Sequence, residues 1–372
     1  MSDISNIRSD RLHPAVARPH PGRPIRVMLV DDSLTVRTVF ARIIEPEADM
    51  VLAGQAGTAE AALAQLATAR PDVILLDLEM PGMGGLRALP RILAGAQGTQ
   101  VLVVSSLTET GAWHSLEAMT AGAADTMPKP RPGDFNQGYH KQLIAKIRAL
   151  GSRNNLADPA APGSPGRDWR CGLRRCGKPA RLVAIGASTG GVHAINAFLR
   201  NLPPSFTLPI LITQHIPATF VPVFARQLAI TSGRETVVAE EGTALAANRI
   251  ILAPGHAHMV VRRQKGGLVT CLDTQPSASG CRPSVDPMLT SIARECDGAA
   301  AAVILSGMGR DGLAGATALI EAGGTVIAQD AYSCAVWGMP KAVTSAGLVA
   351  GTMPPGEMPA WLISSIGGGA WT

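Results

Sequence analysis

Short apolar segments alternate along the chain with longer stretches in which apolar residues recur every three or four positions. From Arg26, the run RVMLV ends in DDS and precedes a helical pattern through about Ile44, and MVLAGQA, DVILLDLEM and VLVVSSL repeat this arrangement. Apolar runs without period-two alternation are typical of strands that are buried on both faces. Alternating strand and helix patterns predict a parallel, doubly wound sheet, so we expect an α/β domain over residues 25–148.

A second series of the same kind follows further along the chain. It begins at RLVAIGAS and continues through LPILITQH, RIILAP, AAVILSGMG and GGTVIAQD, which predicts a second doubly wound parallel sheet over residues 180–370. Residues 149–179 interrupt the pattern with Pro, Gly, Ser and Arg and are interpreted as a flexible linker. Residues 1–24 are polar and proline-rich without the apolar core of a signal peptide, so we expect a disordered tail.

Composition and charge narrow the choice of partners. The 372 residues are 46% hydrophobic and 16% charged, which suffices for two domains with their own cores. The net charge of +5 is concentrated in the tail and the linker, so the two domains are close to neutral. Aromatic residues make up only 3%, and no basic helix-turn-helix follows the linker, which argues against nucleic acid. No apolar run reaches the roughly 18 residues of a membrane-spanning helix, so we expect a cytoplasmic protein that is not inserted in a membrane.

The cysteine pattern gives no sign of a disulfide or metal framework. The six cysteines form no C-x-x-C pair, and Cys171 and Cys176 are the only two that lie close together. No second pair follows at the spacing of a zinc ribbon. We therefore interpret the cysteines as buried or idle reduced thiols.

Functional side chains follow the predicted strands of the first domain. Asp31 and Asp32 follow the first strand, Asp77 the third and Ser105 the fourth, and Lys129 lies after the fifth. Because the carboxyl ends of parallel strands meet at one edge, these side chains should lie together. Clustered carboxylates repel one another unless a cation binds between them, and their oxygens suit Mg²⁺. A lysine and a hydroxyl would complete a phosphoryl site; alternatively, each acid is a helix cap or a loop residue.

The motifs VDDS, LLDLEMPGMGG, VVSS and PKP resemble the flavodoxin-like receiver domain of two-component response regulators. The resemblance implies that Asp77 accepts phosphate from a histidine kinase and that Ser105 and Lys129 bind the phosphoryl oxygens. The Mg²⁺ ligands that it implies are Asp31, Asp32 and Asp77. Thr126 occupies a position that is often aromatic in this family, which leaves the side-chain part of the receiver switch open.

In the second domain, GASTGG places Ser188 in a sharp turn between a strand and a helix. Taken alone, the segment fits a plain turn, a phosphate-binding turn or a nucleophile, since a serine needs a base to attack. His215 ends the next strand and is the candidate base. His256 and His258 compete with it at another strand end, whereas His193 lies on the following helix and should face away.

Asp311 follows a further strand, in SGMGRDG, and an aspartate there can accept the second N–H of a histidine and fix its tautomer. Its alternative role is that of a turn residue before glycine. The neighbouring glycines allow the N–H of Met308 to face a developing oxyanion. The order Ser, His, Asp differs from that of the α/β-hydrolases, chymotrypsin and subtilisin.

The motifs AIGASTGG, QHIP, IILAPGHAHM, RPSVDPML, SGMGRDG and AQDAYSCAVWGMP resemble the chemotaxis protein-glutamate methylesterase (CheB) family. The resemblance implies Ser188 as nucleophile, His215 as general base and Asp311 as the residue that orients it. Met308 and Thr189 are the implied oxyanion residues, and no cofactor is implied in this site. The chain departs from the family pattern at Ser306, often threonine, and at His193.

The implied reaction is hydrolysis of glutamate γ-methyl esters on methyl-accepting chemoreceptors with release of methanol, together with deamidation of receptor glutamines. A receiver joined to this enzyme suggests that the unphosphorylated receiver covers the active site and that phosphorylation exposes it. Two alternatives remain open: a two-component hydrolase of another protein ester or amide, and a phosphorylation-dependent binding module without catalysis.

Overall fold

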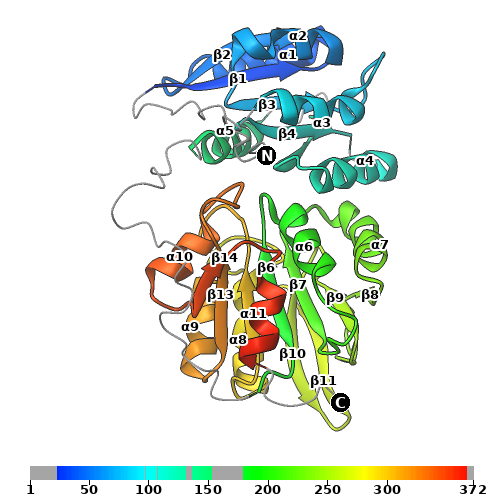
Figure 1. Cartoon of the computed structure of the whole chain (residues 1–372), viewed down its shortest axis with the longest axis vertical. Helices are drawn as coiled ribbons and strands as arrows, with labels where there is room; N and C mark the ends of the chain where they lie inside the picture. Colours follow the sequence, from blue (N-terminus) through cyan, green and yellow to red (C-terminus); the bar gives the residue numbers. More distant parts are fainter. Residues whose placement is uncertain (1–22, 97, 107, 131–135, 153–178, 367–372) are drawn as a thin grey trace, which may run out of the picture.

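The computed structural model describes residues 23–96, 98–106, 108–130, 136–152 and 179–366, which form two α/β parts, one above the other in Figure 1. Nearly all of the predicted tail (1–24) and most of the predicted linker (149–179) lie outside these residues, as do Cys171 and Cys176. Within the described part, no helix is both long enough and apolar enough to cross a membrane.

The N-terminal part is a five-stranded parallel sheet in the order β2-β1-β3-β4-β5, which is the flavodoxin-like order. Helices α1 and α5 cover one face, and α2, α3 and α4 cover the other, because successive strand residues point to opposite faces. The strands are β1 (Ile25–Val30), β2 (Met50–Ala56), β3 (Val73–Asp77), β4 (Gln100–Ser105) and β5 (Asp125–Pro128). The helices are α1 (Leu34–Ile44), α2 (Ala59–Ala69), α3 (Gly85–Gly95), α4 (Glu109–Thr120) and α5 (Gln137–Gly151). Ser33, Thr58 and Thr108 cap α1, α2 and α4 with their hydroxyls.

The C-terminal part contains a seven-stranded parallel sheet in the order β14-β13-β12-β6-β7-β9-β8. Its strands are β6 (Val183–Ala187), β7 (Ile210–Gln214), β8 (Glu235–Val238), β9 (Arg249–Leu252), β12 (Ala301–Ile304), β13 (Thr325–Gln329) and β14 (Gly351–Met353). The helices are α6 (Gly191–Arg200), α7 (Val221–Ser232), α8 (Val285–Glu295), α9 (Leu313–Glu321), α10 (Met339–Ser345) and α11 (Met358–Ile366), with the short 3-10 helix η2 (Ala218–Phe220) before α7. The chain extends the sheet from β6 first through β7 and later through β12. This topological switch point creates a crevice at the carboxyl ends of β6, β7 and β12.

An antiparallel hairpin, β10 (His258–Gln264) and β11 (Gly267–Asp273), stands outside both parallel sheets. The sequence pattern did not indicate it. Met259 and Val261 of the hairpin are buried in the same apolar cluster as Met288 and Ile292 of α8. The loop from the hairpin to α8 is thereby held beside the switch-point crevice.

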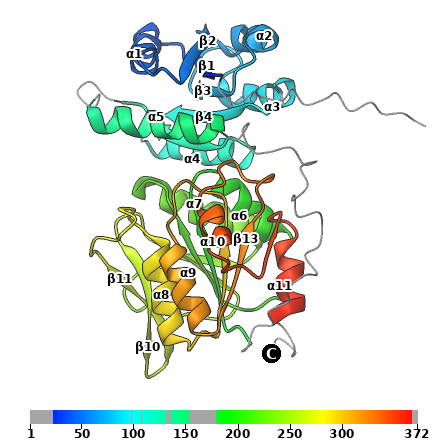
Figure 2. The same ribbon diagram turned by 90° about the vertical axis from the view of Figure 1, so that its left-hand side faces the viewer.

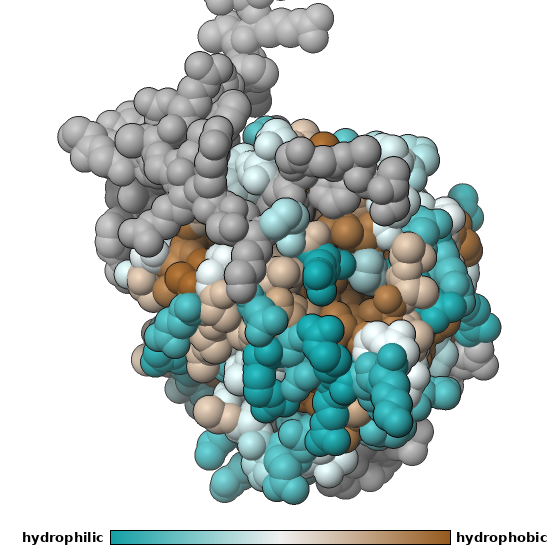
Figure 3. All heavy atoms as spheres, turned by 90° about the horizontal axis from the view of Figure 1, so that it is seen from below, coloured by the Kyte–Doolittle hydropathy of each residue, from teal (hydrophilic) through white to brown (hydrophobic). Residues whose placement is uncertain are grey.

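The two parts contact each other along α4, which packs on η2, α6 and α7; Figure 2 shows α4 between the two parts. The backbone N–H of Gly190 donates to the carbonyl of Ala124, at 2.6 Å. Thr120 at the end of α4 accepts from Asn196 and lies 3.3 Å from His193 through its carbonyl. The face of the molecule opposite this contact, seen in Figure 3, carries hydrophilic residues with apolar ones between them.

Candidate functional site

The strand ends of the N-terminal sheet bring two carboxylates and a lysine together. Lys129 Nζ lies 2.6 Å from Asp77 Oδ2 and 3.2 Å from Asp31 Oδ2. Asp31 and Asp77 are buried, whereas Asp32 is exposed, and oxygens of the three acids lie within 4.8 Å of one another. Parallel pairing of β1 with β3 and of β3 with β4 accounts for this arrangement.

Burial and the contacts within this cluster act in opposite directions on the pKa values of Asp77 and Lys129. It raises the pKa of Asp77 to about 6, although the hydrogen bond from Lys129 acts in the opposite direction. Burial lowers the pKa of Lys129, but its contacts with Asp77 and Asp31 outweigh this and leave the pKa above its usual value. Asp31 Oδ2 is buried, and the partner that it has is the ammonium group of Lys129 at 3.2 Å. Three carboxylates whose oxygens lie within 4.8 Å of one another form the kind of oxygen donor set that Mg²⁺ prefers.

Ser105 does not contact Asp77 by a hydrogen bond. Its buried hydroxyl lies 2.5 Å from Ser115 Oγ on α4, and Ser115 donates to the carbonyl of Gly111. The candidate phosphoryl-binding hydroxyl of β4 is therefore tied to the helix that contacts the C-terminal part.

In the C-terminal part, the turn after β6 holds Ser188 at the switch-point crevice. Gly190 and Gly191 are required there: Gly190 has φ +79°, and a side chain at Gly191 would meet Gln214 Oε1 at 2.1 Å. Gln214 Nε2 donates to the carbonyl of Ser188 at 2.8 Å, and Ser306 Oγ donates to the carbonyl of Thr189 at 2.7 Å. The turn is thus fixed from two sides by residues at the ends of β7 and β12.

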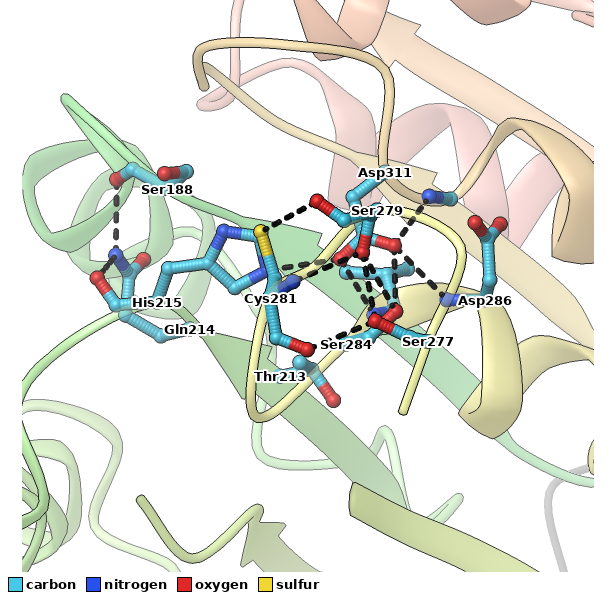
Figure 4. A network of polar contacts seen from close by, with 12 residues as sticks. Ser188, Thr213, Gln214, His215, Ser277, Ser279, Cys281, Ser284, Asp286 and Asp311 are labelled. Carbon is cyan, nitrogen blue, oxygen red and sulfur yellow. Dashed lines mark hydrogen bonds and ion pairs between the residues drawn. The ribbon is translucent and has the colours of Figure 1, made fainter. Parts of the chain in front are cut away.

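His215 and Asp311 meet in the crevice, with His215 Nε2 2.8 Å from Asp311 Oδ2. Figure 4 places the His215 ring between Ser188 and Asp311. Within the described chain, Ser188 Oγ makes no hydrogen bond, so the candidate base His215 contacts Asp311 but not the serine. Burial of the ring lowers the pKa of His215, but hydrogen bonds with Asp311 and Cys281 outweigh it and raise the pKa to about 9.

Asp311 is buried in a network of donors from the start of α8. Its Oδ1 accepts from Ser284 Oγ at 2.6 Å and from the N–H of Gly312 at 3.1 Å, and its Oδ2 accepts from the N–H of Val285 at 2.7 Å. Burial raises the pKa of Asp311, but the contact with His215 and these donors outweigh it, so the pKa lies well below its usual range. The carboxylate is therefore held ionised and in a fixed orientation.

The peptide at Met308 lies beside the serine. Gly307 packs so closely on Ser188 that a side chain there would meet Ser188 Cβ at 2.8 Å. Among the described residues, the N–H groups of Met308 and Thr189 donate to no acceptor. The predicted oxyanion role of Met308 and Thr189 requires N–H groups without an internal acceptor, as these are.

Comparison with known proteins identifies both parts. A family model described as CheB methylesterase matches residues 183–362, and one described as response regulator receiver domain matches residues 27–137. The protein-glutamate methylesterase/protein-glutamine glutaminase 1 of Paramagnetospirillum magneticum is 41% identical over 374 residues, with 94% of this chain and 98% of that protein covered. The chain belongs to the CheB methylesterase family.

Two further relatives agree with this assignment. The protein-glutamate methylesterase/protein-glutamine glutaminase 2 of Caulobacter vibrioides is 41% identical, with 91% of this chain and 98% of that protein covered. The enzyme of the group 2 operon of Bradyrhizobium diazoefficiens is 39% identical, covering 89% and 91%. The predicted fold class, a receiver followed by a methylesterase domain, is confirmed.

The histidines that compete with His215 are engaged elsewhere. His258 is buried, with Nδ1 accepting from the N–H of Ser284 and Nε2 2.8 Å from the carbonyl of Gln275. Since Nδ1 is an acceptor, the proton of the neutral ring is on Nε2. His256 is exposed, and His193 faces Thr120 of the receiver.

Sequence reasoning missed three residues of the methylesterase site. Gln214 precedes the candidate base by one residue, but nothing in its strand predicts that its side chain reaches back to Ser188. Ser284 and Cys281 come from the loop after the unexpected hairpin. Cys281 is not an idle thiol, because it is half-buried and contacts His215. This contact lowers the pKa of the Cys281 thiol. The motif RPSVDPML was the signal that marked this loop.

Proposed function

We propose that this chain hydrolyses glutamate γ-methyl esters of chemoreceptors, and deamidates their glutamines, with Ser188 as the nucleophile. The observation that carries the proposal is the His215–Asp311 contact of 2.8 Å beside a serine whose turn is held by Gln214 and Ser306. The names of the relatives, protein-glutamate methylesterase/protein-glutamine glutaminase, support the substrate class.

The reaction begins when neutral His215 takes the proton of Ser188 Oγ and the oxygen attacks the ester carbonyl. Because Nε2 contacts Asp311, the ring nitrogen that serves Ser188 is Nδ1. Asp311 accepts the N–H of Nε2 and stabilises the imidazolium. The protonated ring then gives its proton to departing methanol, or to ammonia from a glutamine, and water hydrolyses the glutamyl enzyme by the reverse proton transfers. The free N–H groups of Met308 and Thr189 stabilise the tetrahedral oxyanion.

The receiver holds the nucleophile turn in an inhibited arrangement. Asp125 at the start of β5 accepts a hydrogen bond from the Thr189 hydroxyl and forms an ion pair with Lys146 of α5. The adjacent N–H of Gly190 is bound by the carbonyl of Ala124. These contacts attach the residues next to Ser188 to the receiver. They support the proposal that the enzyme is activated when the contacts break.

Phosphorylation of Asp77 by a histidine kinase supplies that release. Asp31, Asp32 and Asp77 would hold Mg²⁺, and its charge would offset that of the phosphoryl oxygens. Lys129 binds the phosphoryl group as a donor. The group also takes the hydroxyl of Ser105 away from Ser115, which loosens α4 from η2, α6 and α7. The coupling element is thus a helix that contacts both parts.

Release of methanol from methylated receptor membranes tests the proposal directly. Wild type, Ser188→Ala and the control Ser364→Ala, whose hydroxyl lies on the distant α11, are assayed with and without a small-molecule phosphodonor and Mg²⁺. We expect faster release with phosphodonor in wild type and control, and none from Ser188→Ala. Equal rates in Ser188→Ala and wild type would refute the nucleophile and favour the binding-module alternative. Release from another methylated protein but not from receptors would favour the alternative hydrolase.

A further inference from the structure

A thiol, an imidazole and a carboxylate converge at the entrance of the crevice. Cys281 comes from the loop between β11 and α8, His215 from the end of β7 and Asp311 from the loop after β12. One donor atom from each side chain lies within 4.8 Å of the other two. Figure 4 shows the Cys281 sulfur against the His215 ring, with Asp311 on the far side of that ring from Ser188.

These donors and their spacing suit Zn²⁺. Zinc binds cysteine sulfur, histidine nitrogen and carboxylate oxygen tetrahedrally, with bonds of about 2.3, 2.1 and 2.1 Å. Ligand atoms around such an ion lie roughly 3.3 to 3.7 Å apart. The His215–Asp311 separation of 2.8 Å must therefore widen by only about 0.5 Å, and the three donor atoms are already within 4.8 Å of one another.

The surroundings hold the ligands and leave room for a fourth. Ser284, Val285 and Gly312 orient the Asp311 carboxylate by hydrogen bonds, as the outer partners of metal ligands do. His215 keeps 15% of its side-chain surface exposed and Cys281 is half-buried, so solvent reaches the open position. Within the described residues, the only other such cluster is the all-oxygen group of the receiver.

We propose that His215, Cys281 and Asp311 bind Zn²⁺, with water as the fourth ligand, and that zinc inhibits the esterase. The inhibitory part rests on the proposed role of His215 as base. A metal on Nε2 takes the place of the proton shared with Asp311, so the neutral ring carries its one proton on Nδ1. The ring can then neither donate to Asp311 nor accept the proton of Ser188. The site can therefore bind zinc or catalyse the reaction, but not both at the same time.

Co²⁺ serves as a spectroscopic probe for the zinc site. The full chain is titrated with Co²⁺ after replacement of Cys171 and Cys176 by alanine, which removes the thiols of the linker. We expect a near-ultraviolet thiolate-to-cobalt charge-transfer band and visible bands of tetrahedral intensity, both abolished by Zn²⁺. Cys281→Ala should lose the charge-transfer band, and the control Cys271→Ala, a buried thiol of β11, should keep it. Absence of the band in the parent protein, or its persistence in Cys281→Ala, would overturn the proposal.

Two further measurements separate metal binding from the proposed reaction. Ser188→Ala should retain the cobalt spectrum, because the serine is not a ligand, so the metal site can be verified even if the esterase assay fails. In the active enzyme, Cys281→Ala should need at least about tenfold more Zn²⁺ for half-inhibition than Cys271→Ala, as expected when one of three protein ligands is lost. Equal zinc sensitivity of the two variants would overturn the inhibitory role. Thermal unfolding of each variant checks that the fold is retained.

Discussion

The receiver part and the methylesterase part bring their functional side chains together in different ways. Both place functional side chains at the carboxyl ends of parallel strands, where the switch of strand order opens a crevice. In the receiver, every member of the acid cluster is adjacent to a strand of one sheet. In the methylesterase, Ser188, His215 and Asp311 follow strands, but the residues that orient Asp311 come from a loop after the hairpin.

The two sites also differ in how their carboxylates are surrounded. The receiver keeps Asp31 and Asp77 near one lysine, an arrangement that awaits a divalent cation and a phosphoryl group. In the methylesterase part, Asp311 is a buried carboxylate that accepts hydrogen bonds from Ser284 and Val285 and contacts His215. The candidate site of the receiver is thus built from residues at strand ends, whereas that of the methylesterase part includes residues from an additional loop.

The largest effect is expected from the acid of the methylesterase. Asp311→Asn should lower the rate of methanol release by the activated enzyme about 10³- to 10⁴-fold, because an amide cannot hold and stabilise the imidazolium. The control is Asp273→Asn at the end of β11, whose side chain caps only a local turn. A loss of less than tenfold in Asp311→Asn would remove Asp311 from the catalytic site.

The next largest effect concerns the receiver. Asp77→Asn should reduce the ratio of activities with and without phosphodonor to one, because an amide cannot accept the phosphoryl group. Asp49→Asn, which replaces an exposed acid paired with Arg148, should respond as wild type does. Stimulation that persists in Asp77→Asn would place the phosphorylated residue elsewhere.

Ser284→Ala tests whether the loop after the hairpin contributes to catalysis. The variant removes a 2.6 Å donor to the ionised Asp311, and we expect an activity about tenfold lower, since hydrogen bonds to charged groups contribute roughly 1.5 to 3 kcal/mol. Ser364→Ala is the matched control, because its hydroxyl donates to the carbonyl of Trp361 on α11 and contacts neither Ser284 nor Asp311. Equal activity of the two variants would show that the Ser284 hydroxyl does not contribute to catalysis.

Thr189→Val tests the contact between the two regions. Loss of the hydroxyl that binds Asp125 should raise the activity without phosphodonor about fivefold, because a hydrogen bond of roughly 1 kcal/mol no longer stabilises the inhibited arrangement. Activity with saturating phosphodonor should stay within twofold of wild type. Thr317→Val on α9, whose hydroxyl binds only its own helix, should change neither value. A lower unphosphorylated activity in Thr189→Val would contradict the inhibitory role of this contact.

The smallest effect is a shift in pH dependence. Attack by Ser188 needs neutral His215, so activity should rise with pH through the pKa of His215, which lies near 9. The Cys281 contact stabilises the charged ring, so Cys281→Ala lowers this pKa and moves the rising limb to lower pH. The rate profile of the phosphorylated enzyme is measured with a metal chelator present, against Cys271→Ala. An unshifted limb would mean that the thiol does not act on the base.

Much of this architecture was predictable because the signals are local. Buried strands followed by helices predicted the parallel α/β class of both parts and their central strands, but not the edge strands β8 and β14. The side chains that follow the predicted strands were the candidates for both sites. The hairpin was not predictable in the same way, since its strands are antiparallel and are stabilised by α8, which follows later in the chain. The competition among histidines was resolved only by contacts: His258 is bound to Ser284 and Gln275.

The sequence by itself determined two parallel α/β domains and the residues that follow their strands, because strand burial and the position after a strand are properties of short segments. Only the tertiary structure decided which partners those residues meet: Cys281 at His215, Ser284 at Asp311, Asp125 at Thr189 and Ser115 at Ser105. Three of these four pairs join residues more than 25 positions apart. Such contacts depend on how whole elements pack, and packing is set by the shapes and volumes of buried side chains rather than by local pattern.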